Sequence, residues 1–439
     1  MTAPKRTQIV IAGGGFAGVA CAKLLVEEER AQATLIDLNG YHQFQPLLYQ
    51  VATAELAGRD MTFEHTEVFR GQDGVTLVKA EAVAVDVDQR SVTLADGTEV
   101  SGDYLVLAAG AQPNFFHTPG ARDYAFPLYS LTDARRLRER VLQVIGDAAA
   151  KPELIDDGAL TFVVVGGGAT GVEISGALSE LIHDVMPHRY PNLAVAGAKI
   201  ILVDLGHTVL APFSDESHEY AAKQLRRRGV ELRLGNAVTE VAPDHVVLRD
   251  GSTIRTHLVV WGGGEMAAGI AGNAGIGQGR GGRIDVNPDL SVPGHPNVFA
   301  VGDIANIPSG DETLPQLGSV AQQSGAWAAR NILGDIDGTG RTPFHYRDKG
   351  IMAMIGRKAA VAEIGAHRHE MHGRLAFAAW LGVHAELLAN AGAELRAFVA
   401  WAEDFYFRPH HRSAELLDPS QVELPRIQWG HSGRDSRSG

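Results

Sequence analysis

Two glycine-rich segments carry the clearest chemical signal in this sequence of 439 residues. Residues 8–19 read QIVIAGGGFAGV, and residues 162–173 read FVVVGGGATGVE. The shared pattern G-x-G-x-x-G consists of Gly13, Gly15 and Gly18, and then of Gly166, Gly168 and Gly171. In this pattern the first glycine makes a tight turn, the second lets a pyrophosphate approach the backbone, and the third lets a helix pack on a strand. The sequence therefore predicts two dinucleotide sites, each with its phosphates at a helix N-terminus.

A carboxylate at the end of the following strand is expected to bind the hydroxyl groups of a ribose. Asp37 lies 19 residues after Gly18 and meets this expectation, and Asp204 is the candidate after the second segment. Because its negative charge would repel a 2′-phosphate, Asp204 favours NADH over NADPH. His207, three residues further on, either softens that preference or is an ordinary loop residue.

Only the second segment continues with an acidic residue, Glu173, two residues after Gly171. This position falls in the first turn of the expected helix, where the helix dipole stabilises an acid by roughly 0.3–1 kcal/mol. A structural role as a helix-terminal acid therefore stands beside a role in chemistry at the second site.

Each glycine segment is expected to join a buried strand to a helix and then to a second strand. The first unit reads QIVIAGGG, FAGVACAKLLVEEE and ATLID, and the second reads TFVVVGGG, ATGVEISGALSELIHDV and AKIILVD. A later part is repeated too, because TLADGTEVSGDYLVLAAG at 93–110 and VLRDGSTIRTHLVVWGGG at 247–264 each contain an Asp-Gly hairpin turn. This duplication predicts an α/β fold with two Rossmann-like domains, right-handed crossovers and a parallel sheet in each.

The composition narrows the class of protein. A formal net charge of −13 gives a nucleic-acid partner no electrostatic support. Cys21 is the only cysteine, so no intramolecular disulfide can form, and it is expected to pack a helix against the sheet. The short polar start before Ile9 and the lack of any run of about 18 apolar residues predict a cytoplasmic protein without a signal peptide or spanning helix. No metal site is predicted.

A third segment, PNVFAVGDIAN, places Gly302 and Asp303 at the end of a late apolar strand. Here the chain resembles the two-dinucleotide flavoproteins, in which such a Gly-Asp pair returns to the first unit and binds the flavin ribityl and phosphate. The resemblance implies FAD in the first unit and a nicotinamide nucleotide in the second. The residues that it implies at the two cofactors are Gly13, Gly14, Gly15, Phe16, Ala17, Gly18, Asp37, Gln45, Val83, Ala109, Gly110, Gly302, Asp303, Val320, Ala321, Gly166, Gly168, Gly171, Asp204 and Gly263.

Longer segments are similar to type II NADH dehydrogenase (NADH:quinone oxidoreductase), over about residues 8–407. They include FQPLLYQVATAEL at 44–56, YLVLAAGAQPNFF at 104–116 and FHYRDKGIMAMIGR at 344–357. Relatives that reduce disulfides carry C-x4-C next to the flavin, and the corresponding residues 41–56 of this chain hold no cysteine. The resemblance therefore excludes a disulfide as electron acceptor. The resemblance implies that bound FAD takes a hydride from NADH and passes two electrons to a quinone, without pumping protons.

The same resemblance implies roles for particular side chains. In the family a segment A-Q-x-x-x-Q precedes a helix whose N-terminus faces the flavin, and its glutamines line the quinone site. In LPQLGSVAQQSG the second glutamine is Gln323, whereas Ser319 stands in place of the first. A structural alternative is that Gln322 and Gln323 only cap a helix. Glu173 is implied between nicotinamide and flavin as a participant in catalysis, and the positive end of the helix after Val320 is implied to stabilise reduced flavin.

The predicted domain organisation follows from the duplication and the resemblance. The second dinucleotide-binding domain is inserted in the first, and a small C-terminal α+β region follows both. The expected bounds are 1–118 with 283–343 for the FAD domain, 119–282 for the NADH domain, 344–407 for the C-terminal domain and 408–439 for a disordered tail.

The C-terminal segment 375–407 leaves two interpretations open. Members of the family carry membrane-binding amphipathic helices here, and an apolar face is available from Trp380, Leu381, Phe398, Trp401 and Phe405. Basic residues that attract anionic lipid are few, and the face is interrupted by Glu386, Glu394, Glu403 and Asp404. The alternatives are a peripheral protein on the cytoplasmic side of the membrane and a soluble protein that buries this face internally or in a homodimer.

Two other functions fit the same sequence. One is a soluble NAD(P)H-dependent flavoprotein reductase that passes electrons to a redox protein, a dye or oxygen. The other is an NADH-sensing flavoprotein that changes partners when it is reduced. The electron acceptor distinguishes these functions from the reduction of a quinone.

Overall fold

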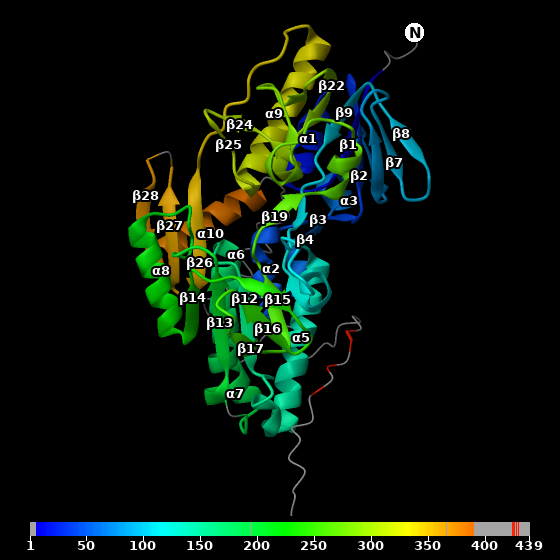
Figure 1. Ribbon diagram of the computed structural model, residues 1–439. Helices are drawn as coiled ribbons and strands as arrows, with labels where there is room; N and C mark the ends of the chain where they lie inside the picture. Colours follow the sequence, from blue (N-terminus) through cyan, green and yellow to red (C-terminus); the bar gives the residue numbers. More distant parts are fainter. Residues whose placement is uncertain are drawn as a thin grey trace, which may run out of the picture. The chain divides into compact units, whose positions relative to one another are not determined.

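The computed structural model of the chain describes residues 6–193, 195–365 and 367–389, together with residues 424, 425, 427 and 429. Apart from those four residues, the predicted helical residues 390–407 and the predicted tail 408–439 lie outside the described residues. The chain forms two compact units, each made of segments that are distant in sequence (Figure 1). The first unit comprises residues 1–43, 62–112 and 265–348, and the second comprises residues 44–61, 113–264 and 349–439.

A six-stranded sheet forms the centre of the first unit, in the order β21-β22-β9-β1-β2-β5. Its strands are β1 (Thr7–Ala12), β2 (Ala31–Asp37), β5 (Val75–Lys79), β9 (Tyr104–Leu107), β21 (Ser291–Val292) and β22 (His295–Ala300). Neighbouring strands run parallel, except that β21 and β22 are antiparallel. Ala12 of β1 pairs with Ile36 of β2 and with Leu107 of β9, so the turn after β1 lies at the carboxyl edge of the sheet.

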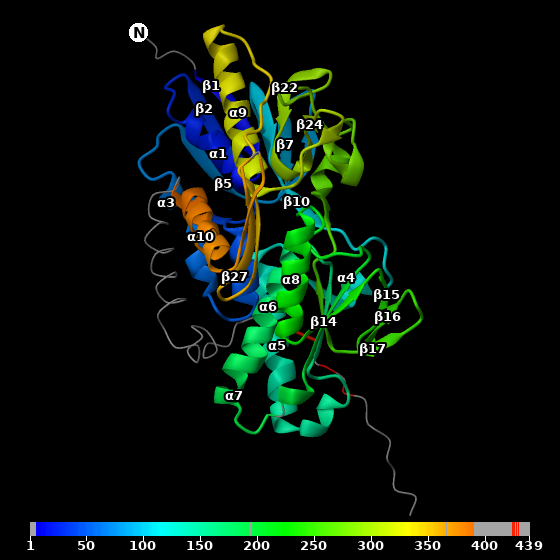
Figure 2. The same ribbon diagram turned by 90° about the vertical axis from the view of Figure 1, so that its left-hand side faces the viewer.

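Two helices, α1 (Phe16–Leu25) and α9 (Gly318–Asp337), lie side by side on one face of this sheet (Figures 1 and 2). They approach closely because the facing residues are small, and a Cβ on Gly325 would overlap the carbonyl oxygen of Ala17. Cys21 is fully buried in α1, and burial raises the pKa of its thiol to about 12. The expected packing role of this cysteine is confirmed.

The second unit is built on a five-stranded sheet in the order β11-β18-β12-β13-β14, with all neighbouring strands parallel. Its strands are β11 (Ala125–Pro127), β12 (Thr161–Val165), β13 (Lys199–Asp204), β14 (Val230–Leu234) and β18 (Leu258–Trp261). The longer helices of residues 113–264 are α5 (Leu131–Ala150), α6 (Ala169–Glu180) and α8 (Asp215–Arg227). β12 is buried along its whole length, as expected for a parallel strand covered on both faces. The predicted α/β class, with a parallel sheet in each of two units, is confirmed.

Each unit also carries the predicted Asp-Gly hairpin within a three-stranded antiparallel sheet. These sheets consist of β6 (Ala82–Asp86), β7 (Ser91–Leu94) and β8 (Glu99–Ser101), and of β15 (Val238–Val241), β16 (His245–Leu248) and β17 (Thr253–Arg255). In the first turn Asp96 Oδ1 accepts a hydrogen bond from the N–H of Thr98 at 2.9 Å. In the second turn Asp250 Oδ1 accepts one from the N–H of Ser252 at 2.9 Å. The duplication therefore extends to single hydrogen bonds.

Residues 350–389 belong to the second unit and add an antiparallel sheet and a helix. These elements are β26 (Gly350–Gly356), β27 (Ala359–Ile364), β28 (His369–His372) and α10 (Arg374–Ala389). Trp380 of α10 is buried, and its ring stacks on His384, whose ring meets Phe44 edge-on. This tryptophan therefore fills the interior of the unit, while Phe398, Trp401 and Phe405 lie outside the described residues.

The shorter elements are β3 (Tyr41–Gln43), α2 (Leu48–Ala52), β4 (Thr62–Glu64), α3 (His65–Val68), β10 (Ala111–Pro113), α4 (Ala121–Tyr124), α7 (Met186–Arg189), β19 (Glu265–Ala267), β20 (Ile284–Asp285), β23 (Ala305–Asn306), β24 (Pro308–Ser309) and β25 (Glu312–Thr313). Among the described residues, no helix has both the length and the apolarity needed to cross a membrane.

Candidate active site

Three glycines shape the turn between β1 and α1, and they do so for different reasons. A Cβ on Gly13, whose φ is 114°, would overlap the carbonyl oxygen of Ala108, and one on Gly18 would overlap that of Gly13. A Cβ on Gly15 would have no atom of the described residues within 4 Å. Packing therefore requires the first and third glycines, whereas the second faces open space where a pyrophosphate can approach the backbone.

The turn between β12 and α6 repeats this arrangement. A Cβ on Gly166, whose φ is 107°, would overlap the carbonyl oxygen of Gly262, and one on Gly171 would overlap that of Gly166. In the part of the chain that the structure describes, no atom lies within 4 Å of a Cβ on Gly168. Gly15 and Gly168 are the N-cap residues of α1 and α6, and neither helix has a side-chain cap among the described residues. The first N–H groups of both helices are therefore available to a phosphate.

Asp37, at the end of β2, is fixed against the first glycine turn. Its Oδ2 atom accepts a hydrogen bond from the N–H of Gly14 at 2.6 Å, and its Oδ1 atom accepts one from the N–H of Asn39 at 2.6 Å. Removal from water raises the pKa of this carboxyl, while the two hydrogen bonds oppose the rise. The predicted ribose carboxylate thus lies directly beside the predicted phosphate turn.

Asp204, at the end of β13, is held in the same way. Its Oδ2 atom accepts a hydrogen bond from the N–H of Gly167 at 2.6 Å, and its Oδ1 atom accepts one from the N–H of Gly206 at 2.6 Å. Gly263 follows β18, and its Cα would lie 2.9 Å from a Cβ on Gly166. The second unit therefore gathers its predicted nucleotide residues around one turn.

The Gly-Asp pair after β22 returns to α1. A Cβ on Gly302 would lie 3.0 Å from the Cβ of Ala17 and 3.3 Å from the Cβ of Ala321, so residues from a strand end and two helices meet here. The Oδ1 atom of Asp303 is inaccessible to water and has no hydrogen-bond partner among the described residues. Burial raises the pKa of this carboxyl to about 6, against the opposing charge of Arg283.

The unpaired oxygen of Asp303 tests whether a flavin dinucleotide fits the first unit. Buried polar atoms are almost always hydrogen-bonded in folded proteins, so this oxygen indicates a missing donor. The ribityl chain of a flavin supplies hydroxyl donors, and the open space at Gly15 suits its pyrophosphate. The ring of Phe16 lies 3.7 Å from a Cβ on Gly318, which brings the start of α9 to the same turn. The residues present therefore fit the cofactor.

The other residues predicted at the flavin are more widely spread. Ala109 and Gly110 follow β9, and the Cα of Ala109 would lie 2.9 Å from a Cβ on the first glycine of the turn. Val320 is buried in the first turn of α9. Val83 lies on β6 with 40% of its surface exposed, and Gln45 begins a 3-10 turn in the second unit. The strand-end residues are therefore placed at the turn, and the binding roles of Val83 and Gln45 stay predictions.

Two buried histidines that the sequence analysis did not single out lie against the first glycine turn. Nδ1 of His42 and Nε2 of His65 lie 3.4 Å and 3.1 Å from the carbonyl oxygen of Gly14. Burial lowers the pKa of His42 to about 4. In the second unit the corresponding carbonyl, that of Gly167, accepts a hydrogen bond from the backbone N–H of Leu210 at 2.7 Å. No spacing rule links either histidine to the glycine pattern, so the sequence offered no signal for them.

Gln323, predicted at the quinone, uses its side-chain amide to hold a neighbouring segment. Its Nε2 atom donates to the carbonyl oxygen of Arg347 at 3.0 Å, and its Oε1 atom accepts from the N–H of the same residue at 3.0 Å. Ser319, one turn earlier, shares a hydrogen bond of 2.9 Å with the hydroxyl of Tyr346. After these contacts the amide of Gln323 keeps one N–H and one oxygen lone pair for a ligand.

Glu173, in the first turn of α6, is tied to β26. Its Oε1 atom accepts a hydrogen bond from the N–H of Met354 at 3.1 Å. Removal from water raises the pKa of the carboxyl from 4.5 to about 8, although this hydrogen bond lowers it. Near neutral pH the group therefore holds a proton for much of the time and can give or take one. The hydrogen bond to β26 gives Glu173 a structural role, and its role in catalysis stays a prediction.

Three further ionisable side chains in the second unit, Glu180, Glu55 and Tyr49, are linked by electrostatic interactions, and the charge of Glu173 acts on Tyr49. Glu180, two turns further along α6, accepts a hydrogen bond from the N–H of Arg357 at 2.6 Å. Removal from water raises the pKa of Glu55 to about 8, and the charge of Glu180 adds to the rise. The pKa of the buried Tyr49 lies well above its usual value because of burial and nearby carboxylates. The sequence analysis did not include these residues, although the seven-residue spacing of Glu173 and Glu180 puts those two on one helix face.

Comparison with known proteins places these features in a family. The family model described as "Pyridine nucleotide-disulphide oxidoreductase" matches residues 7–325. The chain is 34% identical to the type II NADH:quinone oxidoreductase NdhA of Mycobacterium tuberculosis, over 93% of this chain and 89% of the relative. It is 33% identical to a second enzyme of that organism, the type II NADH:quinone oxidoreductase Ndh, over 92% of this chain and 89% of the relative.

Solved structures show the same fold. The structure of NDH2 from Plasmodium falciparum in complex with NADH superposes with a TM-score of 0.83 at 18% identity, covering 92% of this chain and 100% of that one. The sulfide:quinone oxidoreductase of Aquifex aeolicus superposes with a TM-score of 0.73 at 17% identity, covering 91% of this chain and 95% of that one. Together with the extent of the sequence matches, this means that the chain belongs to the pyridine nucleotide-disulphide oxidoreductases and, among them, to the type II NADH:quinone oxidoreductases.

Proposed function

We propose that this chain oxidises NADH and transfers two electrons through bound FAD to a quinone, without pumping protons. The observation that carries the proposal is a duplicated glycine turn whose two copies have different partners. Asp303 returns to the first turn, and Glu173 follows only the second. The names of the Mycobacterium relatives support the same reaction.

FAD is assigned to the first unit, in the predicted domain of residues 1–118 and 283–343. The N-terminus of α1 and the open space at Gly15 would receive its pyrophosphate, and Asp37 would bind ribose hydroxyls. Asp303 would accept hydrogen bonds from the ribityl hydroxyls. When bound, this cofactor supplies the redox chemistry, accepting a hydride and donating electrons.

NADH is assigned to the second unit, in the predicted domain of residues 119–282. The N-terminus of α6 and the open space at Gly168 would receive its pyrophosphate, and Asp204 would bind the adenosine ribose. Because the carboxylate of Asp204 would repel a 2′-phosphate, kcat/KM should be higher for NADH than for NADPH. Glu173 would position the nicotinamide and hold a proton there, and such orientation of reactants is worth up to roughly 7–11 kcal/mol.

The quinone is assigned to the start of α9. Gln323 keeps one N–H donor after its two bonds to Arg347, and this donor would bind a quinone carbonyl. The first N–H groups of α9 lack a side-chain cap among the described residues, so they would stabilise negative charge that develops on bound ligands.

A quinone substrate also suggests a location for the protein. We assign the protein to the cytoplasmic membrane surface, where it would bind peripherally through the segment 375–407. The supporting observation is that Leu375, at the start of α10, is 71% exposed. The buried Trp380 does not contribute to this surface. Sedimentation with anionic lipid vesicles tests the assignment. A homodimer that covers Leu375 would instead double the mass in size-exclusion chromatography and leave the protein in the supernatant.

The decisive experiment follows the absorbance of the purified protein near 450 nm (about this wavelength for an oxidised flavin). NADH should bleach this band, and in stopped flow a short-chain quinone should restore it much faster than oxygen does. Rapid restoration by a ferredoxin-like protein but not by quinone would establish the soluble reductase instead. Bleaching without rapid restoration by any acceptor would establish an NADH-sensing protein.

A further inference from the structure

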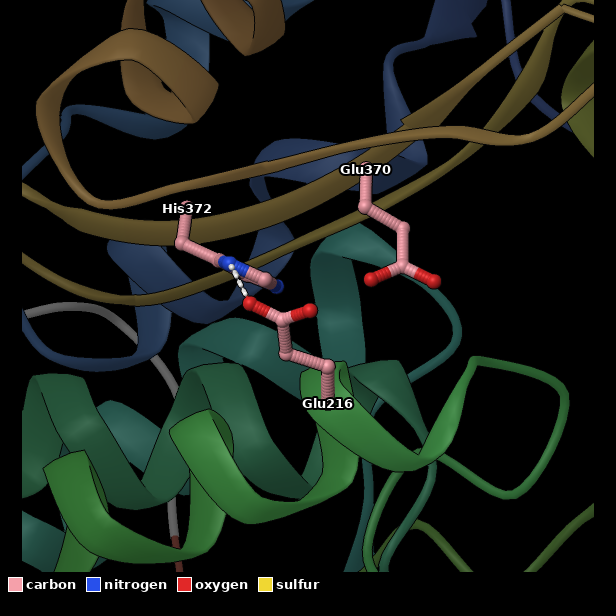
Figure 3. Close-up of side chains that lie close together, drawn as sticks. All are labelled: Glu216, Glu370 and His372. Carbon is pink, nitrogen blue, oxygen red and sulfur yellow. Dashed lines mark ion pairs between the residues drawn. The ribbon is translucent and has the colours of Figure 1, made fainter.

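Three potential metal ligands converge between α8 and β28, outside the residues assigned to either nucleotide. Glu216 lies in the first turn of α8, and Glu370 and His372 lie on β28. One ligand atom of each residue lies within 4.8 Å of those of the other two. Figure 3 shows the two carboxylates and the imidazole turned toward one another from the two elements. We propose that these residues bind a divalent transition-metal ion, and that zinc is the ion of choice.

His372 is held in an orientation that leaves one ring nitrogen for a ligand. Its Nε2 atom lies 3.4 Å from the hydroxyl of Ser217, which donates at 3.0 Å to the buried carboxylate of Glu363. The ring also stacks on Tyr220, with centroids 5.0 Å apart. A proton on Nε2 completes this chain of hydrogen bonds and leaves the lone pair of Nδ1 directed at Glu216. Histidines that bind metals in proteins are oriented by partners of this kind.

The spacing between His372 and Glu216 suits a shared ion better than a direct hydrogen bond. Nδ1 of the histidine lies 3.6 Å from Oε1 of the glutamate, which is beyond the usual N–H···O distance. Ligands at about 2.0–2.1 Å from a tetrahedral zinc ion lie about 3.3–3.4 Å from one another. The observed separation is close to this value, and rotation of the exposed Glu370 side chain would complete the set.

The charges at the cluster also require a positive partner. Glu216 and Glu370 present two carboxylates to each other, and like charges this close repel. Within the described ranges, neither carboxylate forms an ion pair with a lysine or an arginine, and the basic group next to Glu216 is His372 itself. A bound cation would remove this repulsion and would link the edge strand β28 to the first turn of α8.

The mixture of ligands selects among metals. Imidazole nitrogen suits zinc, nickel and cobalt, whereas magnesium and calcium prefer sets of six or more oxygen atoms. Three protein ligands leave a fourth position of zinc for water. Because both glutamates are exposed, the ion should exchange with solution and be removed by a chelator.

The test uses the tag-free, full-length protein after treatment with a chelator. Calorimetric titration with zinc chloride should show one ion per chain, and zinc should raise the Tm by roughly 2–4 °C. Magnesium chloride should produce neither effect. Glu370→Gln and Glu216→Gln should each weaken zinc binding by about tenfold or more, while near-native circular dichroism shows that the variants are folded.

Two matched variants distinguish this site from other surface binding. Glu219→Gln changes an exposed acid three residues after Glu216 on α8 and should leave zinc binding intact. His369→Gln changes an exposed histidine on β28, the strand that carries Glu370 and His372, and should have little effect. The proposal is overturned if zinc binding does not saturate, if Glu370→Gln leaves it unchanged, or if His369→Gln alone abolishes it.

Discussion

The two glycine turns share a backbone but differ in their surroundings. In both, packing excludes a Cβ on the first and third glycines, and a carboxylate is held by two main-chain N–H groups. In the first unit, two imidazoles lie against the carbonyl oxygen of Gly14, whereas in the second unit the carbonyl oxygen of Gly167 bonds to main chain. Asp303 returns only to the first turn, and Glu173 follows only the second.

This difference shows which residues decide what a nucleotide does once it is bound. The glycines make a turn that receives phosphates, and they are alike in both units. In the first unit, His42 and His65 support the turn and Asp303 offers a further carboxylate, and such additional contacts suit a ligand that is retained. A turn supported by main chain, with a protonatable acid in the next helix, suits a ligand that reacts and leaves. The proposed division between FAD and NADH follows this contrast.

The largest effect is expected from Gly18→Ala, compared with Gly15→Ala. A Cβ on Gly18 would overlap the backbone of Gly13, so α1 must shift, and the free energy of unfolding should fall by about 1–3 kcal/mol with loss of bound flavin. Gly15→Ala adds a methyl group to open space, so stability should stay within about 0.5 kcal/mol while flavin binding falls. Thermal unfolding of the flavin-free proteins and the flavin content after purification measure both effects.

The same comparison can be made in the second unit with Gly171→Ala and Gly168→Ala. There the first substitution should destabilise the fold, and the second should weaken NADH binding while flavin content stays normal. If the second and third glycines of either turn prove equally destabilising when replaced, the open space at the second glycine is not a ligand site.

The next effect is expected from Glu173→Gln, which changes the group that distinguishes the second turn. Glutamine can still accept the hydrogen bond from Met354, so NADH affinity should change little. Reduction of the flavin by NADH should slow by about 10²-fold if the carboxyl takes part in proton handling. Stopped-flow bleaching near 450 nm measures the rate, with Glu219→Gln as a surface control. Unchanged kinetics would leave Glu173 a purely structural role.

A smaller effect is expected from a change of pH, because protonation of Glu173 alters the free energy of unfolding. The pKa of Glu173 is about 8 in the folded protein, against 4.5 for an unperturbed glutamate, so between these values the folded state binds more protons. The stability contributed by the protonated group is complete below about pH 4.5 and is lost as the pH rises through 8, by at most about 1.4 kcal/mol per unit. Tm values of the cofactor-free protein from pH 5 to 9 should therefore fall, and the glutamine variant should show a flatter profile. Parallel profiles would contradict the raised pKa.

The sequence predicted the features that depend on contacts between residues close together in the chain. The spacing of the glycines, the Asp-Gly hairpins and the carboxylate after the second strand all reflect local geometry. The structure places Asp37 and Asp204 against their glycine turns through main-chain hydrogen bonds, although nucleotide binding by these residues stays a prediction. The return of Gly302 to α1 was available only through the family resemblance.

The sequence could not predict contacts between segments that are distant in the chain. His42 and His65 reach the carbonyl of Gly14 across 28 and 51 residues. The amide of Gln323 pairs with the main chain of Arg347 across 24 residues, so a side chain predicted only for ligand binding or helix capping also bridges two segments. Such contacts depend on tertiary packing, which brings the segments together without leaving a local pattern.

The smallest effect is expected from His65→Leu, which removes one of the two imidazoles at the first turn. Leucine has a similar size but no hydrogen bond to offer the carbonyl of Gly14, so the free energy of unfolding should fall by about 1 kcal/mol. Flavin should dissociate faster, whereas NADH affinity should be unchanged because main chain supports the corresponding carbonyl in the second unit. Denaturation by urea, release of flavin fluorescence and NADH titration measure the three quantities, with His369→Leu as a surface control. If NADH affinity fell as much as flavin retention, the imidazoles would not act on the first turn alone, and the contrast between the two turns would have to rest on Asp303 and Glu173.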